Sequence, residues 1–163
     1  MQLQHKNIVI IGGTTGMGLS AAKTFIREGA RIVVVGRNEH SVQEAGEVLG
    51  ASAIAFSGDA TQTDTAAKAI QLCMDQFGGF DGLYHVAGGS GRNMGDGPLH
   101  ELSLEGWNWT LHMNLTALML SNQAAVRTFL ALKKGGTILN MGSVLGFSPS
   151  PRFFSTHGYA AAK

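Results

Sequence analysis

The chain has 163 residues, 44% of them hydrophobic and 14% charged, and it carries a formal net charge of +1. This length and composition indicate one globular domain, residues 1–163, and without a basic block they give no reason to expect a nucleic acid or a membrane surface as a partner. The single cysteine, Cys73, excludes an internal disulfide, so we expect a buried structural thiol in a protein of the reducing cytoplasm.

The first predicted strand, residues 8–11, runs directly into a glycine-rich turn that contains Gly12, Gly16 and Gly18. The unbroken apolar run before the turn is typical of a strand buried on both faces of a parallel sheet. Because this apolar run is short, we expect no signal peptide. The glycines let the backbone turn sharply into a helix, whose first N–H groups favour phosphates. Any tight turn of this kind needs glycine, but its position after a buried strand favours a dinucleotide-binding site.

Strand and helix patterns alternate along the rest of the chain. We expect helices over residues 16–28, over residues 39–49, from an N-cap at Thr63 to Phe77, and over residues 103–133. We expect further strands over 31–35, 53–56, 80–86 and 137–141, and a glycine-rich loop over 88–98. This alternation is typical of an α/β protein with a parallel sheet covered by helices on both faces. The predicted fold is a doubly wound, Rossmann-type sheet with strand order 3-2-1-4-5.

The end of the second predicted strand indicates which dinucleotide binds. In dinucleotide-binding folds an acidic residue near this point takes the ribose hydroxyls of NAD, whereas an arginine accommodates the 2′-phosphate of NADP. Here the sequence reads Gly36-Arg37-Asn38, with no acidic residue at the tip. Arg37 can form two hydrogen bonds with a phosphate, which favours NADP over NAD, although it could also be a solvated surface residue. Asp59, after the third strand, could accept a hydrogen bond from the adenine amino group or serve as a turn residue.

The last residues, from Tyr159 to Lys163, place a phenol and an ammonium on one face of a predicted helix. A tyrosine with a pKa of about 10 is a poor acid or base near neutral pH. A neighbouring cation favours the phenolate and lowers this pKa, so the phenol can exchange protons near pH 7. By itself, such a pair is more often a packing pair or part of a solvated face.

Two further polar residues are candidates for the same crevice. Ser143 follows the fifth predicted strand, and ligands of such sheets bind outside the carboxyl ends of the strands. Asn114 lies inside the long predicted helix, where asparagine is a weak helix former and could be kept for a polar contact or a water. The alternatives are a serine in a local turn and a satisfied interior amide.

Together these motifs resemble the short-chain dehydrogenase/reductase family, and the spacing Gly12-x-x-x-Gly16-x-Gly18 is similar to that of its single-domain branch. The other residues that carry the resemblance follow the family's order: Asp59, Ala87-Gly88, Asn114, Ser143 and Tyr159-x-x-x-Lys163. The resemblance implies an NAD(P)-dependent oxidoreductase of small alcohols and carbonyls. It also implies a homodimer or homotetramer, because the helix equivalent to the long one often pairs between subunits.

The resemblance also implies roles for individual residues. Tyr159 is the expected proton donor or acceptor at the substrate oxygen, Lys163 lowers its pKa and binds the nicotinamide ribose, and Ser143 binds the substrate oxygen. Asn114 is expected to hold a water that links Lys163 to solvent. The dinucleotide is expected to contact Gly12, Thr14, Thr15, Gly16, Met17, Gly18, Arg37, Asn38, Asp59, Ala60, Ala87, Gly88, Tyr159 and Lys163.

Some features depart from the family pattern. His85-Val86 stands where the family usually has two asparagines that brace the sheet beside the cofactor. The segment between Ser143 and Tyr159 is slightly longer than usual, which is expected to reshape the substrate mouth. Family members continue beyond the lysine with at least two more strands, so we expect a dinucleotide-binding domain that is incomplete at its C-terminus, with an exposed fifth strand.

Two other functions stay open. A non-catalytic dinucleotide-binding module is favoured by the early end of the chain and by His85-Val86. A methyltransferase also uses a glycine-rich turn after its first strand, but it has no role for Ser143, Tyr159 and Lys163. The six histidines show no ligand spacing, so no metal site is expected.

Overall fold

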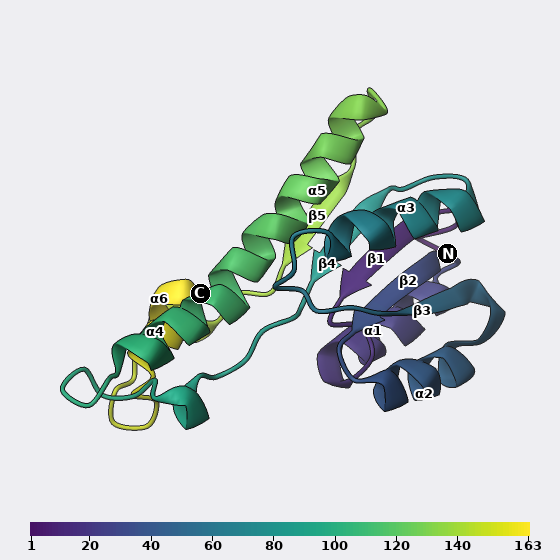
Figure 1. The fold of residues 1–163 in the computed structure, drawn as a ribbon. Helices are drawn as coiled ribbons and strands as arrows, with labels where there is room; N and C mark the ends of the chain where they lie inside the picture. Colours follow the sequence, from purple (N-terminus) through teal and green to yellow (C-terminus); the bar gives the residue numbers. More distant parts are fainter.

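The computed structural model describes all residues, 1–163, as a five-stranded parallel sheet with helices on both faces (Figure 1). The elements are β1 (Asn7–Ile11), α1 (Gly16–Arg27), β2 (Arg31–Gly36), α2 (Glu39–Leu49), β3 (Ala53–Ser57), α3 (Thr65–Phe77), β4 (Gly82–His85), α4 (Leu104–Leu111), α5 (Ala117–Ala131), β5 (Thr137–Asn140) and α6 (His157–Ala162). The strand order is β3-β2-β1-β4-β5. The predicted doubly wound α/β sheet is therefore confirmed.

Two apolar clusters hold the helices on the sheet. On one face Val9 and Ile11 pack with α3 and α5, and on the other face Ile10 packs with α1 and α2. Because successive residues of a strand point to opposite faces, β1 and β2 contribute to both clusters, which explains their unbroken apolar runs. Cys73 is fully buried in the first cluster, and burial raises the pKa of its thiol to about 12, so the predicted buried thiol is confirmed.

Two predicted boundaries were wrong. Thr63 does not cap α3: the N-cap position belongs to Asp64, whose carboxylate makes no capping hydrogen bond and instead pairs with Lys68 at 2.7 Å. The expected strand over 80–86 is shorter, Gly82–His85, because only these residues pair with β1 and β5.

The long helix expected over 103–133 is two helices joined by a π-helical turn, His112–Thr116. Ser103 begins the first of them as its N-cap and accepts a hydrogen bond from the Gly106 N–H at 2.9 Å. The Asn114 amide, inside the turn, donates to the Thr110 carbonyl one turn earlier, at 2.9 Å. Such a side chain competes with the helix's own backbone bonds, and π-turns are frequent at functional sites.

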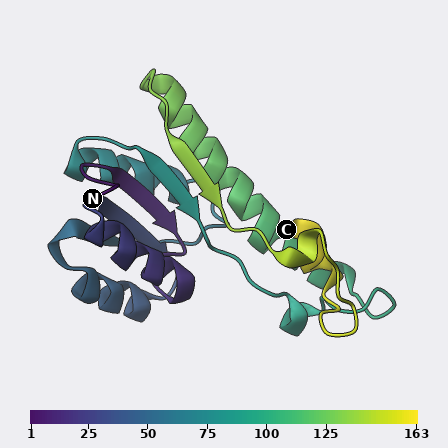
Figure 2. The same ribbon diagram turned by 180° about the vertical axis from the view of Figure 1, so that it is seen from behind.

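The part of the chain that contains α4 and α6 extends beyond the carboxyl ends of β4 and β5 (Figure 2). Neither apolar cluster includes a residue of α4 or α6. The two helices pack on each other and on the π-helical turn instead. No helix combines the length and the apolar character that crossing a membrane requires.

Candidate active site

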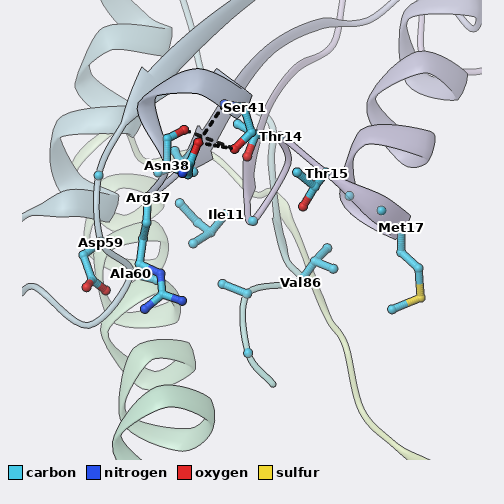
Figure 3. Close-up of a pocket in the computed structure, with 18 of the residues that line it drawn as sticks. Ile11, Thr14, Thr15, Met17, Arg37, Asn38, Ser41, Asp59, Ala60 and Val86 are labelled. Carbon is cyan, nitrogen blue, oxygen red and sulfur yellow. Dashed lines mark hydrogen bonds between the residues drawn. The ribbon is translucent and has the colours of Figure 1, made fainter. Parts of the chain in front are cut away.

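A cleft of about 380 Å³ opens at the carboxyl ends of β1 and β2 (Figure 3). It is lined by every residue expected to contact the dinucleotide except Tyr159 and Lys163: Gly12, Thr14, Thr15, Gly16, Met17, Gly18, Arg37, Asn38, Asp59, Ala60, Ala87 and Gly88. The sequence analysis did not single out Ser41, Gly58 and Met113, which also line it. These three carry no motif, and only the fold brings them to the cleft.

The glycine turn between β1 and α1 fits the floor of this cleft closely. Gly12 has φ +87°, and a Cβ at this position would lie 2.7 Å from the Ala87 nitrogen. A Cβ on Gly18 would collide with the Gly12 carbonyl. At the start of α1, the Thr15 side chain makes no capping hydrogen bond and the first turn has no acidic residue. The first N–H groups of this helix are therefore available to an anion in the cleft.

One wall of the cleft carries Arg37 and Asp59 side by side (Figure 3). Arg37 forms no ion pair within 4.0 Å and is exposed. The Asp59 Oδ1 accepts hydrogen bonds from the Thr61 N–H and hydroxyl at 2.9 and 2.8 Å. Partial burial raises the pKa of Asp59, but the bonds from Thr61 and the charge of Arg37 outweigh it, so the pKa lies below its ordinary value.

Asn38, next to Arg37 at the same wall, is the N-cap of α2. Its Oδ1 accepts a hydrogen bond from the Ser41 N–H at 3.0 Å (Figure 3). This bond fixes the tip of β2, so Arg37 projects from a rigid turn. Glu39 is already the first residue of α2 and does not line the cleft.

Tyr159 lies on α6 and Lys163, one turn later, is its C-cap residue; the Lys163 ammonium is 5.7 Å from the centre of the Tyr159 ring. The ammonium also donates to the Met141 carbonyl at 3.1 Å, just after β5. Burial lowers the pKa of Lys163 below its ordinary value. The Tyr159 ring therefore has a half-buried cation beside it.

Asn114 and Gly88 bring the lysine to the end of the cleft. Asn114 is fully buried; its Oδ1 accepts from the Gly89 N–H at 3.0 Å, and its amide donates to the Gly89 carbonyl at 2.9 Å. Gly88 has φ +152°, and a Cβ there would lie 3.3 Å from the Lys163 Nζ and 2.5 Å from the Asn114 Oδ1. The structure thus places Asn114 and Lys163 around one backbone position that lines the cleft.

Ser143 and Tyr159 line a second cavity of about 590 Å³ together with Ser90, Arg92 and Phe154. Ser143 follows β5, and its Oγ accepts a hydrogen bond from the Leu145 N–H at 3.2 Å, so the expected local turn is present as well. Tyr159 thus lies at the second cavity, and Lys163, one helix turn later, lies beside Gly88 at the cleft.

His85 is a polar residue in the sheet whose partner the sequence did not reveal. It is fully buried at the end of β4, and its Nδ1 is 3.0 Å from the Ser121 Oγ on α5. Its Nε2 has no hydrogen-bond partner. Burial lowers the pKa of His85 to about 4, with a smaller effect from the nearby Lys163 charge. The imidazole is neutral near pH 7 and ties the strand to α5.

Three comparisons with known proteins agree. A sequence profile described as short chain dehydrogenase matches residues 6–163. The chain is 31% identical over 165 residues to 2-(S)-hydroxypropyl-CoM dehydrogenase 3 of Xanthobacter autotrophicus (99% of this chain, 62% of that protein). It is 33% identical over 153 residues to the 2,5-dichloro-2,5-cyclohexadiene-1,4-diol dehydrogenase of Sphingobium indicum (91% and 59%). The chain thus spans about three fifths of the length of these curated relatives.

Solved structures agree with the sequences. A crystal structure of a short chain dehydrogenase from Bacillus anthracis superposes with a TM-score of 0.88 at 28% identity, over 100% of this chain and 64% of that one. A short chain dehydrogenase from Mycobacterium smegmatis superposes with a TM-score of 0.89 at 29% identity, over 99% and 66%. The described residues include no group of three or more His, Cys, Asp or Glu side chains that could hold a metal ion.

Proposed function

This chain belongs to the short chain dehydrogenase family, and on that premise we propose that it transfers a hydride between NADP and the carbon of a small alcohol or carbonyl compound. Residues 1–163 act as the dinucleotide-binding domain. The observation that carries the proposal is the pair of Tyr159 and Lys163: the phenol lines the second cavity, and the ammonium beside it lies next to Gly88, which lines the cleft. The proposed enzyme assembles as a homodimer or homotetramer. An exposed apolar row on one face of the π-helical turn and α5 supports this assembly: Leu115, Met119, Val126 and Leu130.

The cleft fits a dinucleotide because its floor is bare backbone: a Cβ on Gly12 would clash with the Ala87 backbone, and one on Gly18 would clash with the Gly12 carbonyl. The first N–H groups of α1 bind the pyrophosphate, flanked by Thr15 and Met17, and Asp59 lies near the adenine. Lys163 holds the ribose end. The bound cofactor supplies or accepts the hydride at its nicotinamide ring.

Tyr159 manages the proton. In the reduction direction its phenol donates a proton to the carbonyl oxygen of the substrate while that carbon receives the hydride; in the oxidation direction the phenolate accepts the proton back. The Lys163 ammonium stabilises the phenolate, and Ser143 donates a hydrogen bond to the substrate oxygen on which charge develops. Asn114 orients a water that exchanges protons between Lys163 and solvent.

Arg37 carries the proposed preference for NADP, because it is an unpaired guanidinium at the tip of β2 and no carboxylate occupies this position. The test is a titration of the protein with NADPH, NADH and S-adenosylmethionine, followed by NADPH oxidation with a panel of carbonyl compounds. We expect NADPH to bind at least tenfold more tightly than NADH, and Arg37→Asp to remove this difference. Tighter binding of NADH by the unchanged protein would contradict the preference.

The alternative is a non-catalytic dinucleotide-binding module. The His85-Val86 departure favoured it, but His85 here braces β4 against α5 through Ser121, which is the kind of support that the usual asparagines give. NADPH binding without oxidation by any carbonyl compound in the panel would support this alternative. Binding of S-adenosylmethionine alone would support a methyltransferase.

A further inference from the structure

Asp96, in the glycine-rich loop before α4, is a buried carboxylate that the proposed function does not use; it is 2% exposed. Its Oδ1 accepts a hydrogen bond from the Gly158 N–H and its Oδ2 from the Tyr159 N–H, both at 2.8 Å. These are the second and third residues of α6, whose N–H groups have no partner within the helix. Thr156, the residue at the N-cap position, makes no capping hydrogen bond. A residue from a distant loop thus caps α6.

Close packing holds Asp96 in this position. A Cβ on Gly158 would lie 3.1 Å from the Asp96 Oδ2, and a Cβ on Gly91 would lie 3.1 Å from the Asp96 Cβ. A Cβ on Gly106, in α4, would lie 2.6 Å from the Asp96 nitrogen. The Asp96 N–H donates to the Gly91 carbonyl at 3.1 Å. Asp96 therefore packs closely between α4 and α6, and the absence of a side chain at these glycines allows the close approach.

The cap matters more here than at most helices. Because α6 belongs to neither apolar cluster of the sheet, packing against the main core does not fix its position. The loop makes two more contacts with it, both at the Gly97 carbonyl: the His157 N–H donates to this carbonyl at 3.4 Å, and the His157 Nδ1 lies 2.9 Å from it. An ionised carboxylate also suits the positive end of a helix, and its bonds to N–H groups are stronger than those of a neutral side chain.

We propose that Asp96 is a positioning residue for proton transfer: by binding the backbone N–H of Tyr159 it keeps the phenol beside the Lys163 ammonium and at the wall of the cavity that Ser143 lines. This inference rests on the proposed function of Tyr159 and Lys163. Asp96 contacts neither cleft nor cavity, so its effect reaches the reaction only through α6.

The test compares Asp96→Asn, which keeps one acceptor oxygen, with Asp96→Ala, which keeps none. We expect kcat to fall about tenfold and about a hundredfold, respectively, while the Kd for NADPH rises by a much smaller factor, because most of the cleft lies on the sheet and only Lys163 comes from the α6 end. Hydrogen exchange at the Gly158 and Tyr159 amides becomes faster in both variants.

Cys73→Ala is the control. This residue packs α3 against the sheet, so its loss destabilises the core, and it lines neither the cleft nor the second cavity. Cys73→Ala should lower Tm without lowering the kcat measured at 25 °C. The Asp96 variants are compared with Cys73→Ala at equal Tm. If they lose no more kcat than Cys73→Ala does, the proposal is overturned. If Asp96→Ala does not fold, Asp96→Asn decides. If the unchanged protein oxidises no NADPH, the proposed function fails, and amide exchange decides alone: faster exchange confined to α6 supports the cap, and unchanged exchange refutes it.

Discussion

The side chains of the candidate active site work through the charges that lie next to them. Tyr159 has an ammonium 5.7 Å from its ring, and Asp59 has a guanidinium nearby that lowers its pKa. A single substitution can therefore remove one chemical step and leave binding intact. The sequence already pointed to these residues, because each belongs to a short motif, whereas the pairing of His85 with Ser121 joins residues 36 positions apart and left no local signal.

Replacing Tyr159 by Phe should reduce kcat by about a thousandfold, because the phenol that exchanges the proton is lost while the ring and its packing remain. The Kd for NADPH should change less than twofold, as measured by fluorescence titration. Tyr84→Phe is the matched control, since it removes the hydroxyl of the only other tyrosine, which lies in the sheet and outside the cavity. Equal kcat in Tyr159→Phe and Tyr84→Phe would exclude the proposed proton transfer.

The His85 side chain should make the fold sensitive to acid. Its pKa is about 4 in the folded protein and about 6.5 in the unfolded chain, so the unfolded chain binds a proton first as the pH falls. The contribution of neutral His85 to the free energy of unfolding is complete above pH 6.5. It is lost as the pH falls towards 4, and the loss is about 3 kcal/mol at most. Urea unfolding of the unchanged protein and of His85→Asn, at pH 7 and at pH 4.5, measures this loss. The variant should lose less stability over this interval; an equal loss would assign the sensitivity to other groups.

At the scale of elements, strands and helices were predictable wherever the pattern is local. The apolar runs of β1 and β2, the glycine turn before α1 and the start of a helix near residue 103 all appear where the sequence indicated. The errors have physical reasons. The Asp59–Thr61 turn delays the start of α3, and the Asn114 side chain, which bonds to Thr110, accompanies a π-helical turn within the long helix. The capping of α6 by Asp96 depends on a loop 62 residues earlier, so no local pattern could reveal it.

The turn between β1 and α1 should tolerate no side chain at Gly12. In Gly12→Ala the residue must keep φ +87°, and its Cβ would lie 2.7 Å from the Ala87 backbone, which cannot move without disturbing β4. We expect the Kd for NADPH to rise at least tenfold and the free energy of unfolding to fall by about 1–3 kcal/mol. Gly50→Ala is the control: it has φ +69° but nothing within 4 Å, so it shows the conformational cost alone. If both variants bind NADPH equally well, close packing of the turn is unimportant.

At the scale of the molecule, the chain has two parts of different construction. The sheet and the helices α1, α2, α3 and α5 share two apolar clusters, whereas α4 and α6 lie beyond the strand ends, outside both clusters, and pack on each other (Figure 2). The proposed dinucleotide site uses both parts, with Gly12 in the first and Lys163 in the second. Segments with few buried apolar contacts open locally at lower free energy than the core.

Hydrogen exchange should therefore show two levels of protection, and NADPH should reduce the difference. Without ligand, the amides of β1 and β2 should exchange most slowly and those of α6 much faster, because α6 can open without unfolding the sheet. NADPH bound across both parts should slow exchange in the glycine turn and in α6 together, since opening α6 would then also release the ligand. Adenosine 2′,5′-bisphosphate is the matched ligand: it offers the Arg37 wall a 2′-phosphate but has no nicotinamide, so it should protect the turn and leave α6 unchanged. Equal protection of α6 by both ligands would mean that the nicotinamide end does not reach Lys163, and the catalytic assignment of α6 would then fail.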